Sequence, residues 1–204
     1  MVAQTKPEFS PDEYLALERE ASAKSEFLCG GIYAMTGGSP QHARIAASVI
    51  ASMVVQLKGK PCSVYSSDLR IASANSTLIT YPDVSIVCGE PAFHDSKKDV
   101  VTNPVVLVEV FSDSTEAYDR GKKFTYYRTI ESLQDYILVS QKEPMIDLYS
   151  KEPNGTWRIQ SITGLEQETA IDVPSIACRL LLSDVYDGIE FAAVQDAGED
   201  KVEA

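Results

Sequence analysis

Long apolar runs are missing from this sequence. No hydrophobic stretch approaches the roughly 20 residues that a helix needs to cross a bilayer. The first residues, MVAQTKPEFSPDEY, also lack the apolar centre of a signal peptide. We therefore expect a cytoplasmic protein. The 204 residues show no internal repeat or linker, so we expect one folded domain over residues 1–190 and an acidic, disordered tail over residues 191–204.

Cysteine and histidine are scarce. Cys29, Cys62, Cys88 and Cys178 are scattered without CxxC spacing, and His42 and His94 lie far apart in the sequence. This spacing argues against a structural zinc site and against a disulfide framework. Free cysteines are usually buried, so buried, reduced thiols are the expectation here.

Basic residues are also few, with 18 Lys and Arg against 30 Asp and Glu, and the net charge is −12. A chain this acidic does not coat nucleic acid non-specifically, because neutralising phosphates requires a basic surface. A nucleic-acid substrate remains compatible with this charge if basic groups are concentrated locally or a cation mediates the contact.

Capping and turn signals divide the chain into alternating helices and strands. The sequence predicts helices from Ser10 to about Ala23, from Ser39 to about Gly59 and from about Thr115 to Ile130, and a last short helix within SDVYDGIEF. It predicts a hairpin turning at Gly30-Gly31 and strands in CSVYSSDLRIAS, LITYPDVSIVCG, PVVLVEVF, QDYILVSQ, MIDLYSKE and WRIQSIT. This order indicates a mixed α/β (α+β) domain in which helices pack against a central sheet of mixed strand pairing.

Glu109 is the unusual residue of the strand PVVLVEVF, which is otherwise apolar on both faces. A buried, isolated carboxylate costs several kcal/mol or more unless it is paired. Glu109 must therefore have a partner, which is a basic side chain, a set of hydrogen-bond donors or a metal ion.

Asp83 is a second acid in an unusual place, directly after Pro82 inside a predicted strand. Proline cannot donate to the strand ladder, so the strand is an edge strand or is bulged or bent there. Two acids on consecutive strands repel unless a cation lies between them, and oxygen ligands without a Cys/His cluster favour Mg²⁺ or Mn²⁺. The alternative, with about equal support, is that Asp83 caps a turn while Glu109 pairs with an arginine such as Arg44 or Arg70.

The helix after Glu109 carries Asp119, Lys123 and Tyr127 at a spacing of four residues, which places them on one stripe. Asp119 and Lys123 could form an exposed ion pair of a few tenths of a kcal/mol. Alternatively, the helix packs on the sheet and brings Lys123 to the two acids, where it can position or deprotonate a water and neutralise phosphate charge.

The segments YPDVSIV, VLVEVFSDST and YDRGKKFTYYRTIESLQDYILV resemble the Uma family of restriction endonucleases, within the PD-(D/E)XK nuclease superfamily. The resemblance covers roughly residues 10–190 and includes SEFLCGGIYAMTGGSPQHARIA, which is similar to the family's hairpin followed by a histidine. It implies a single restriction-endonuclease-like domain with a mixed central β-sheet flanked by helices.

The resemblance also implies roles for individual residues. Pro82-Asp83 matches the PD element and Glu109 the (D/E) position, so Asp83, Glu109 and Val110 are the implied metal site for Mg²⁺ or Mn²⁺. The superfamily lysine would fall on Phe111, which cannot replace it, and the resemblance suggests that Lys123 in DRGKKF takes its place. Further candidate residues of the site are Glu26, His42, Lys122 and Tyr127.

Three functions are compatible with these residues. The first is a Mg²⁺-dependent endonuclease that hydrolyses DNA phosphodiester bonds with a metal-activated water, acting as a homodimer because two strands require two sites. The second is a catalytically inactive binding or structural protein on the nuclease fold. The third is a metal-dependent hydrolase of a smaller phosphoester. The fold alone cannot choose among them, because function depends on the site.

Overall fold

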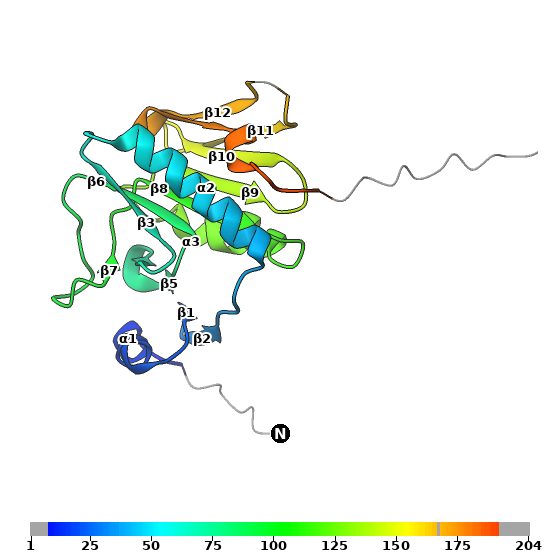
Figure 1. Ribbon diagram of the computed structural model, residues 1–204. Coiled ribbons are helices and arrows are strands. Elements are labelled where there is room, and N and C mark those ends of the chain that lie inside the picture. Colours follow the sequence, from blue (N-terminus) through cyan, green and yellow to red (C-terminus); the bar gives the residue numbers. More distant parts are fainter. Residues whose placement is uncertain (1–7, 167, 192–204) are drawn as a thin grey trace, which may run out of the picture.

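The computed structural model describes residues 8–166 and 168–191 (Figure 1). Apart from Phe191, which packs on Tyr186 with ring centroids 5.3 Å apart, the predicted tail lies outside the described residues. Within these ranges no helix is both long and apolar enough to span a membrane.

A six-stranded mixed sheet forms the centre of the molecule, in the order β11-β10-β9-β8-β6-β3. Its neighbours pair antiparallel except β8 and β9, which are parallel. The central strand β8 is buried along its whole length, as its apolar sequence predicts. The strands are β3 (Cys62–Ser66), β6 (Val84–Cys88), β8 (Val106–Phe111), β9 (Asp135–Ser140), β10 (Met145–Lys151) and β11 (Trp157–Thr163).

Two different layers cover the faces of this sheet. The long helix α2 (Pro40–Leu57) crosses one face (Figure 1) and buries a stripe of apolar residues against Val108 and Val110. The same core includes the hairpin β12 (Ala170–Val173) and β13 (Cys178–Leu181), the turn η3 (Pro174–Ile176) and the helix α4 (Leu182–Val185). The opposite face, with Leu107 and Phe111, packs against the helical segment η2 (Tyr118–Lys123) and α3 (Phe124–Tyr127).

The N-terminal part forms a second sheet, in the order β2-β1-β5-β4-β7, covered by α1 (Pro11–Glu20). The predicted capping box of α1 is present, since Ser10 and Glu13 exchange hydrogen bonds. The strands are β1 (Ser25–Leu28), β2 (Gly31–Ala34), β4 (Arg70–Ala72), β5 (Leu78–Thr80) and β7 (Val100–Val101), and a short turn, η1 (Ala74–Ser76), precedes β5.

This second sheet corrects the sequence interpretation, which expected one central sheet. CSVYSSDLRIAS is divided into β3 and β4, and LITYPDVSIVCG into β5 and β6, so that each predicted strand contributes to both sheets. The second break includes Pro82, where the ladder could not continue. β7, β12 and β13 were not predicted.

The helix predicted after Glu109 contains a π-helical segment, η2. Its wider turns change the angular spacing of side chains, and π-helical segments occur frequently at functional sites. Asp119, Lys123 and Tyr127 are nevertheless all buried, so the predicted stripe faces the sheet.

The expectation of buried, reduced thiols is wrong for three of the four cysteines. Cys62 and Cys88 lie directly opposite each other on β3 and β6 and form a disulfide. Cys29 is exposed, and only Cys178 is a buried thiol. No spacing motif in the sequence indicates this pair, because strand pairing brings the two cysteines together.

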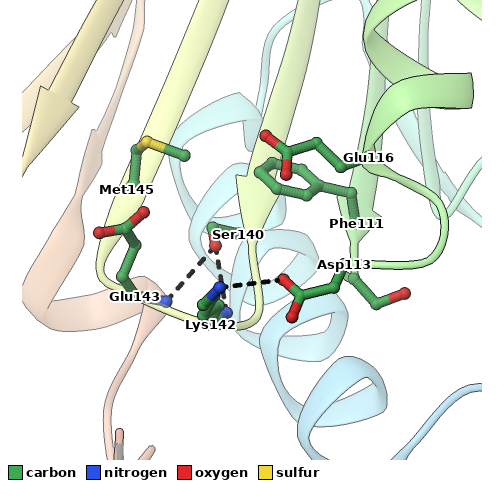
Figure 2. Close-up of a pocket in the computed structure, with 8 residues that line it drawn as sticks. Phe111, Asp113, Glu116, Ser140, Lys142, Glu143 and Met145 are labelled. Atoms are coloured by element: carbon green, nitrogen blue, oxygen red, sulfur yellow. Dashed lines mark hydrogen bonds and ion pairs between the residues drawn. The ribbon is translucent and has the colours of Figure 1, made fainter. Parts of the chain in front are cut away.

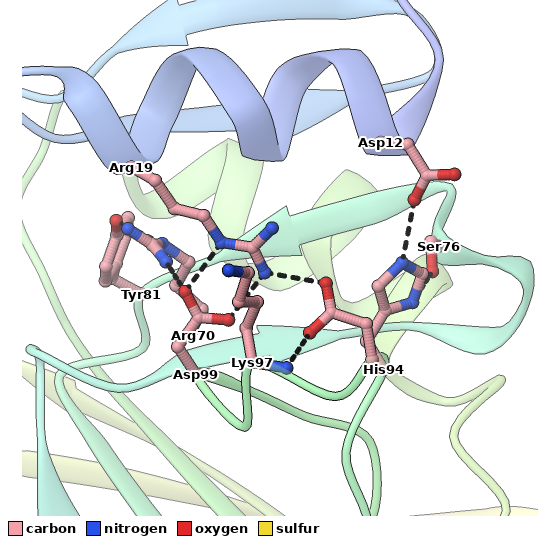
Figure 3. Close-up of polar contacts among 9 residues, drawn as sticks. Asp12, Arg19, Arg70, Ser76, Tyr81, His94, Lys97 and Asp99 are labelled. Atoms are coloured by element: carbon pink, nitrogen blue, oxygen red, sulfur yellow. Dashed lines mark hydrogen bonds and ion pairs between the residues drawn. The ribbon is translucent and has the colours of Figure 1, made fainter.

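A polar network attaches α1 to the rest of the protein (Figure 3). Arg19 of α1 forms hydrogen bonds to Asp99 at 2.9 and 2.7 Å, and Arg70 contacts the same carboxylate at 2.8 Å. Beside them the Tyr81 hydroxyl donates to the buried Glu18 at 2.7 Å and accepts from Arg70 at 2.6 Å. Tyr81 begins the crossing between the two sheets, so the network fixes the chain just before Asp83.

We expect Tyr81→Phe to lower the free energy of unfolding by about 1–3 kcal/mol, because Glu18 and Arg70 both lose a buried partner. Urea unfolding followed by circular dichroism measures the change. Tyr65→Phe on β3 is the matched control, since the Tyr65 hydroxyl has no hydrogen-bond partner among the described residues. Equal effects of the two substitutions would contradict the assigned role of the network.

Candidate active site

Asp83 directly precedes β6, and Glu109 lies in the neighbouring strand β8. The strand register pairs Val84 with Val108, so one further step places Asp83 opposite Glu109. Instead of continuing the ladder, the Asp83 carboxylate accepts a hydrogen bond from the Val110 backbone N–H at 2.7 Å through Oδ2. Because the strand ladder breaks at Pro82, the Asp83 side chain turns toward the main chain of β8.

Glu109 belongs to the sheet face covered by η2 and α3, and its partners come from that segment. The Lys123 Nζ lies 2.8 Å from Glu109 Oε1, and the Tyr127 hydroxyl donates to the same oxygen at 2.7 Å. Asp119 Oδ1 is 3.5 Å from Lys123 Nζ. These side chains are buried, with Glu109 only 5 % exposed.

This cluster answers why an apolar strand tolerates Glu109: its partner in the structure is Lys123. The arginine alternatives are wrong, because Arg44 contacts Asp187 and Arg70 contacts Asp99 and Tyr81. The exposed ion pair expected of Asp119 and Lys123 is also wrong, since their side chains are only 6 % and 7 % exposed.

One ammonium faces two buried carboxylates, and this imbalance governs their proton affinities. Burial raises the pKa of Glu109 to about 8, although Lys123 opposes the shift. Burial raises the pKa of Asp119 as well. Burial lowers the pKa of Lys123, but attraction from Glu109 and Asp119, with a contribution from Glu26, outweighs it and the pKa lies above its usual value. Lys123 therefore keeps its proton, and an acid is the group that titrates first.

His42 forms the other half of the site. Its Nε2 lies 2.8 Å from Asp83 Oδ1, and the side chains are 23 % and 14 % exposed. The hydrogen bond to Asp83 raises the pKa of His42, against partial burial. His42 reaches Asp83 because the predicted N-cap, Ser39, starts α2 at this point of the sheet.

Glu26 and Lys122, the remaining candidates, have different positions. Glu26 on β1 accepts hydrogen bonds from the Tyr118 hydroxyl at 2.7 Å and from Thr80 at 3.0 Å, and it lies within electrostatic reach of Lys123. Lys122 is exposed, so the helix turns Lys123 and not Lys122 toward the acids.

Phe111 occupies the position of the superfamily lysine and packs instead. It is buried and lies under the Arg120 guanidinium, 4.9 Å from the ring centroid. Its ring lines a pocket at the ends of β8 and β9 (Figure 2), whose other walls include Asp113, Glu116 and Lys142. Neither acid of the candidate site lines this pocket.

Sequence reasoning missed Gln141 and Tyr118. Gln141 Nε2 lies 3.3 Å from His42 Nδ1 and 3.5 Å from the Val110 carbonyl oxygen. Gln141 ends a predicted strand and Tyr118 precedes Lys123 by five residues, and neither spacing indicates a site. The only available signal for Gln141 was its polar position directly after a buried strand.

The mixed central sheet flanked by helices is a restriction-endonuclease-like fold. A solved structure of "a putative nuclease belonging to DUF820" from Anabaena variabilis shares the fold, with a TM-score of 0.71, 17 % identity and coverage of 87 % of this chain and 97 % of that chain. The model of the Uma2 family, described as "Putative restriction endonuclease", matches residues 11–181. The chain belongs to the Uma2 family, which confirms the resemblance found in the sequence.

Two uncharacterized proteins of Synechocystis sp. are also similar along nearly their whole length. One is 39 % identical over 185 residues, which cover 91 % of this chain and 95 % of the relative. The other is 33 % identical over 168 residues, which cover 82 % of this chain and 95 % of the relative.

We expect Lys123→Met to lower the free energy of unfolding by about 3–5 kcal/mol, because it leaves Glu109 and Asp119 buried without a cation. Lys122→Met, the adjacent control, should change it by no more than about 0.5 kcal/mol, because Lys122 is exposed. Thermal and urea unfolding of both variants measure the difference.

The stability deficit of Lys123→Met should depend on pH. Glu109 has a pKa of about 8 in the folded protein against an ordinary 4.5, so the folded state binds the extra proton between these values. The unfolded value of 4.5 is common to both proteins and cancels in the difference, whereas loss of Lys123 raises the folded pKa of Glu109 above 8. The deficit should therefore be smallest at acid pH, where both acids are protonated in the folded state, and the part due to Glu109 should grow only as the pH rises above 8. A deficit independent of pH would show that the lost packing of the lysine stem dominates.

Proposed function

We propose that this protein is a metal-dependent endonuclease that hydrolyses phosphodiester bonds of DNA with Mg²⁺ or Mn²⁺. The observation that carries the proposal is that the Asp83 carboxylate accepts a hydrogen bond from the Val110 N–H, directly after Glu109, whose own side chain pairs with the buried ammonium of Lys123. Membership of the Uma2 family supports the same class of reaction.

The donor set fits a hard divalent cation. Among the described residues, no three His, Cys, Asp or Glu side chains are grouped to hold a metal ion, so this is not an all-protein cage. Mg²⁺ is commonly held by one or two carboxylates, with waters and substrate phosphate completing its shell. Asp83, Glu109 and the Val110 carbonyl would hold the ion, which when bound would supply a water of lowered pKa and polarise the phosphate.

The other residues of the site have separable roles in this proposal. Lys123 acts as a fixed positive charge near the phosphate and not as a base, because its raised pKa keeps it protonated. Tyr127 holds Glu109 in place through its hydrogen bond of 2.7 Å, and Asp119 holds Lys123 through its contact at 3.5 Å. His42 is partly exposed beside Asp83 and is the candidate for moving a proton at the site.

A second candidate function is a binding or structural protein without catalysis. The observation that favours it is that Lys123 already compensates Glu109, so the fold needs no metal to tolerate the buried acid. The net charge of −12 also offers few groups for phosphate contact.

The proposal includes a cytoplasmic homodimer. A duplex has two antiparallel strands related by twofold symmetry, and two copies of one site match that symmetry. Sedimentation of the purified protein with and without duplex DNA measures the number of copies.

We expect the wild-type protein to nick or linearise supercoiled plasmid in the presence of Mg²⁺ or Mn²⁺, and Asp83→Asn to reduce the rate by more than about a hundredfold. Loss of a group that only supports a metal ligand reduces activity by up to about a hundredfold, and loss of a ligand itself should reduce it further. Mg²⁺ should also raise the melting temperature of the wild type but not that of Asp83→Asn. Asp172→Asn is the control, because Asp172 is an exposed aspartate of β12.

Two outcomes would count against this function. In the first, the wild-type protein cleaves no plasmid with any divalent cation and Mg²⁺ does not change its melting temperature. This result favours the binding or structural function. Equal cleavage by wild type and Asp83→Asn assigns the activity to another site or to a contaminant.

A further inference from the structure

Gln141 connects the end of β9 to the beginning of α2. Its backbone N–H donates to the Phe111 carbonyl at 3.1 Å, and its own carbonyl accepts from the Gln41 side chain at 2.7 Å. Its side-chain Oε1 accepts from the hydroxyl of Ser39, the N-cap of α2, at 2.9 Å. Two of these contacts involve only main-chain atoms of Gln141, so a substitution of its side chain leaves them in place.

The surroundings of the Gln141 amide fix its orientation. Nε2 lies 3.5 Å from the Val110 carbonyl oxygen and 3.3 Å from His42 Nδ1. A carbonyl oxygen can only accept, so the amide NH₂ and not Oε1 must face it. Reversing the amide would set two acceptors against each other at Val110.

This orientation determines where the neutral imidazole of His42 carries its proton. With Nδ1 accepting from Gln141, the ring hydrogen is on Nε2, which lies 2.8 Å from Asp83 Oδ1. Asp83 then accepts from His42 through Oδ1 and from the Val110 N–H through Oδ2. The carboxylate is held at both oxygens, and this sets the direction of its remaining lone pairs.

We propose that Gln141 is a positioning residue that orders two of the three proposed metal ligands. It acts on Asp83 through the tautomer of His42 and on the Val110 carbonyl directly. Its importance for metal binding rests on the proposed function, whereas its effect on His42 does not. Gln141 touches neither Glu109 nor Lys123, so its removal leaves the buried ion pair intact.

The first experiment is nitrogen-15 NMR of the histidine rings in the metal-free, full-length protein, at a pH where both rings are neutral. The chain has only two histidines, so His94→Gln assigns the signals. The wild type should show Nδ1 of His42 as an unprotonated nitrogen and Nε2 as N–H. Gln141→Met, which keeps the length but removes both polar atoms, should shift both signals toward a tautomer mixture. Gln160→Met on the exposed surface of β11 is the control and should leave them unchanged.

The second experiment measures Mn²⁺ affinity and plasmid cleavage for the same proteins. Loss of a residue that orients a metal ligand commonly costs 10–100-fold in affinity or activity, and we expect a loss in this range for Gln141→Met. A Nδ1–H tautomer in the wild type, or unchanged ring signals in Gln141→Met, overturns the positioning role. A third outcome is that the ring signals change in Gln141→Met while the wild-type protein neither binds Mn²⁺ nor cleaves DNA. That result supports the positioning role and counts against the proposed function alone.

Discussion

The ammonium of Lys123 pairs with two carboxylates that are buried against the main sheet. Glu109 in the centre of β8 requires a partner on its face of the sheet, and Lys123 supplies it. This requirement constrains the segment after β8, which must return onto the sheet as η2 and α3 and present Lys123 inward. The Tyr127 hydroxyl adds a donor to the same oxygen of Glu109, so one helical segment supplies both partners.

The two halves of the candidate site are supported from opposite faces of one sheet. Glu109 is held from the face covered by η2 and α3, and Asp83 is held by His42 from α2, which covers the other face. The main chain of β8 joins them, because the N–H of Val110 binds Asp83. The side chains of the two proposed acidic metal ligands are thus held by packing layers on both faces of the sheet.

A negative net charge over the whole chain does not by itself decide whether a local site can bind a phosphate. The net charge of −12 describes the whole surface, whereas the field at the site depends on a few groups at short distance. Lys123 is shielded from solvent, so salt screens its pairs with Glu109 and Asp119 less than it would screen an exposed ion pair. The same burial makes the cluster sensitive to substitution, since removing Lys123 would leave Glu109 and Asp119 buried without a cation.

The sequence by itself determined the elements that depend on local signals. Ser10 and Ser39 marked the beginnings of two helices, and Glu109 was recognisable as a buried acid because its neighbours are apolar on both faces. The stripe that includes Lys123 followed from helical spacing, although the π-helical turns in it did not. Membership of the nuclease-like family was likewise visible in short motifs around Asp83.

Only the tertiary structure decided which groups meet. The disulfide between Cys62 and Cys88 and the division into two sheets depend on strand pairing between distant segments. The choice of Lys123 as the partner of Glu109 depends on how the following helical segment packs on the sheet. Gln141 reaches His42 across 99 positions of sequence. Local propensity carries no information about such contacts, because their geometry is set by the packing of whole layers.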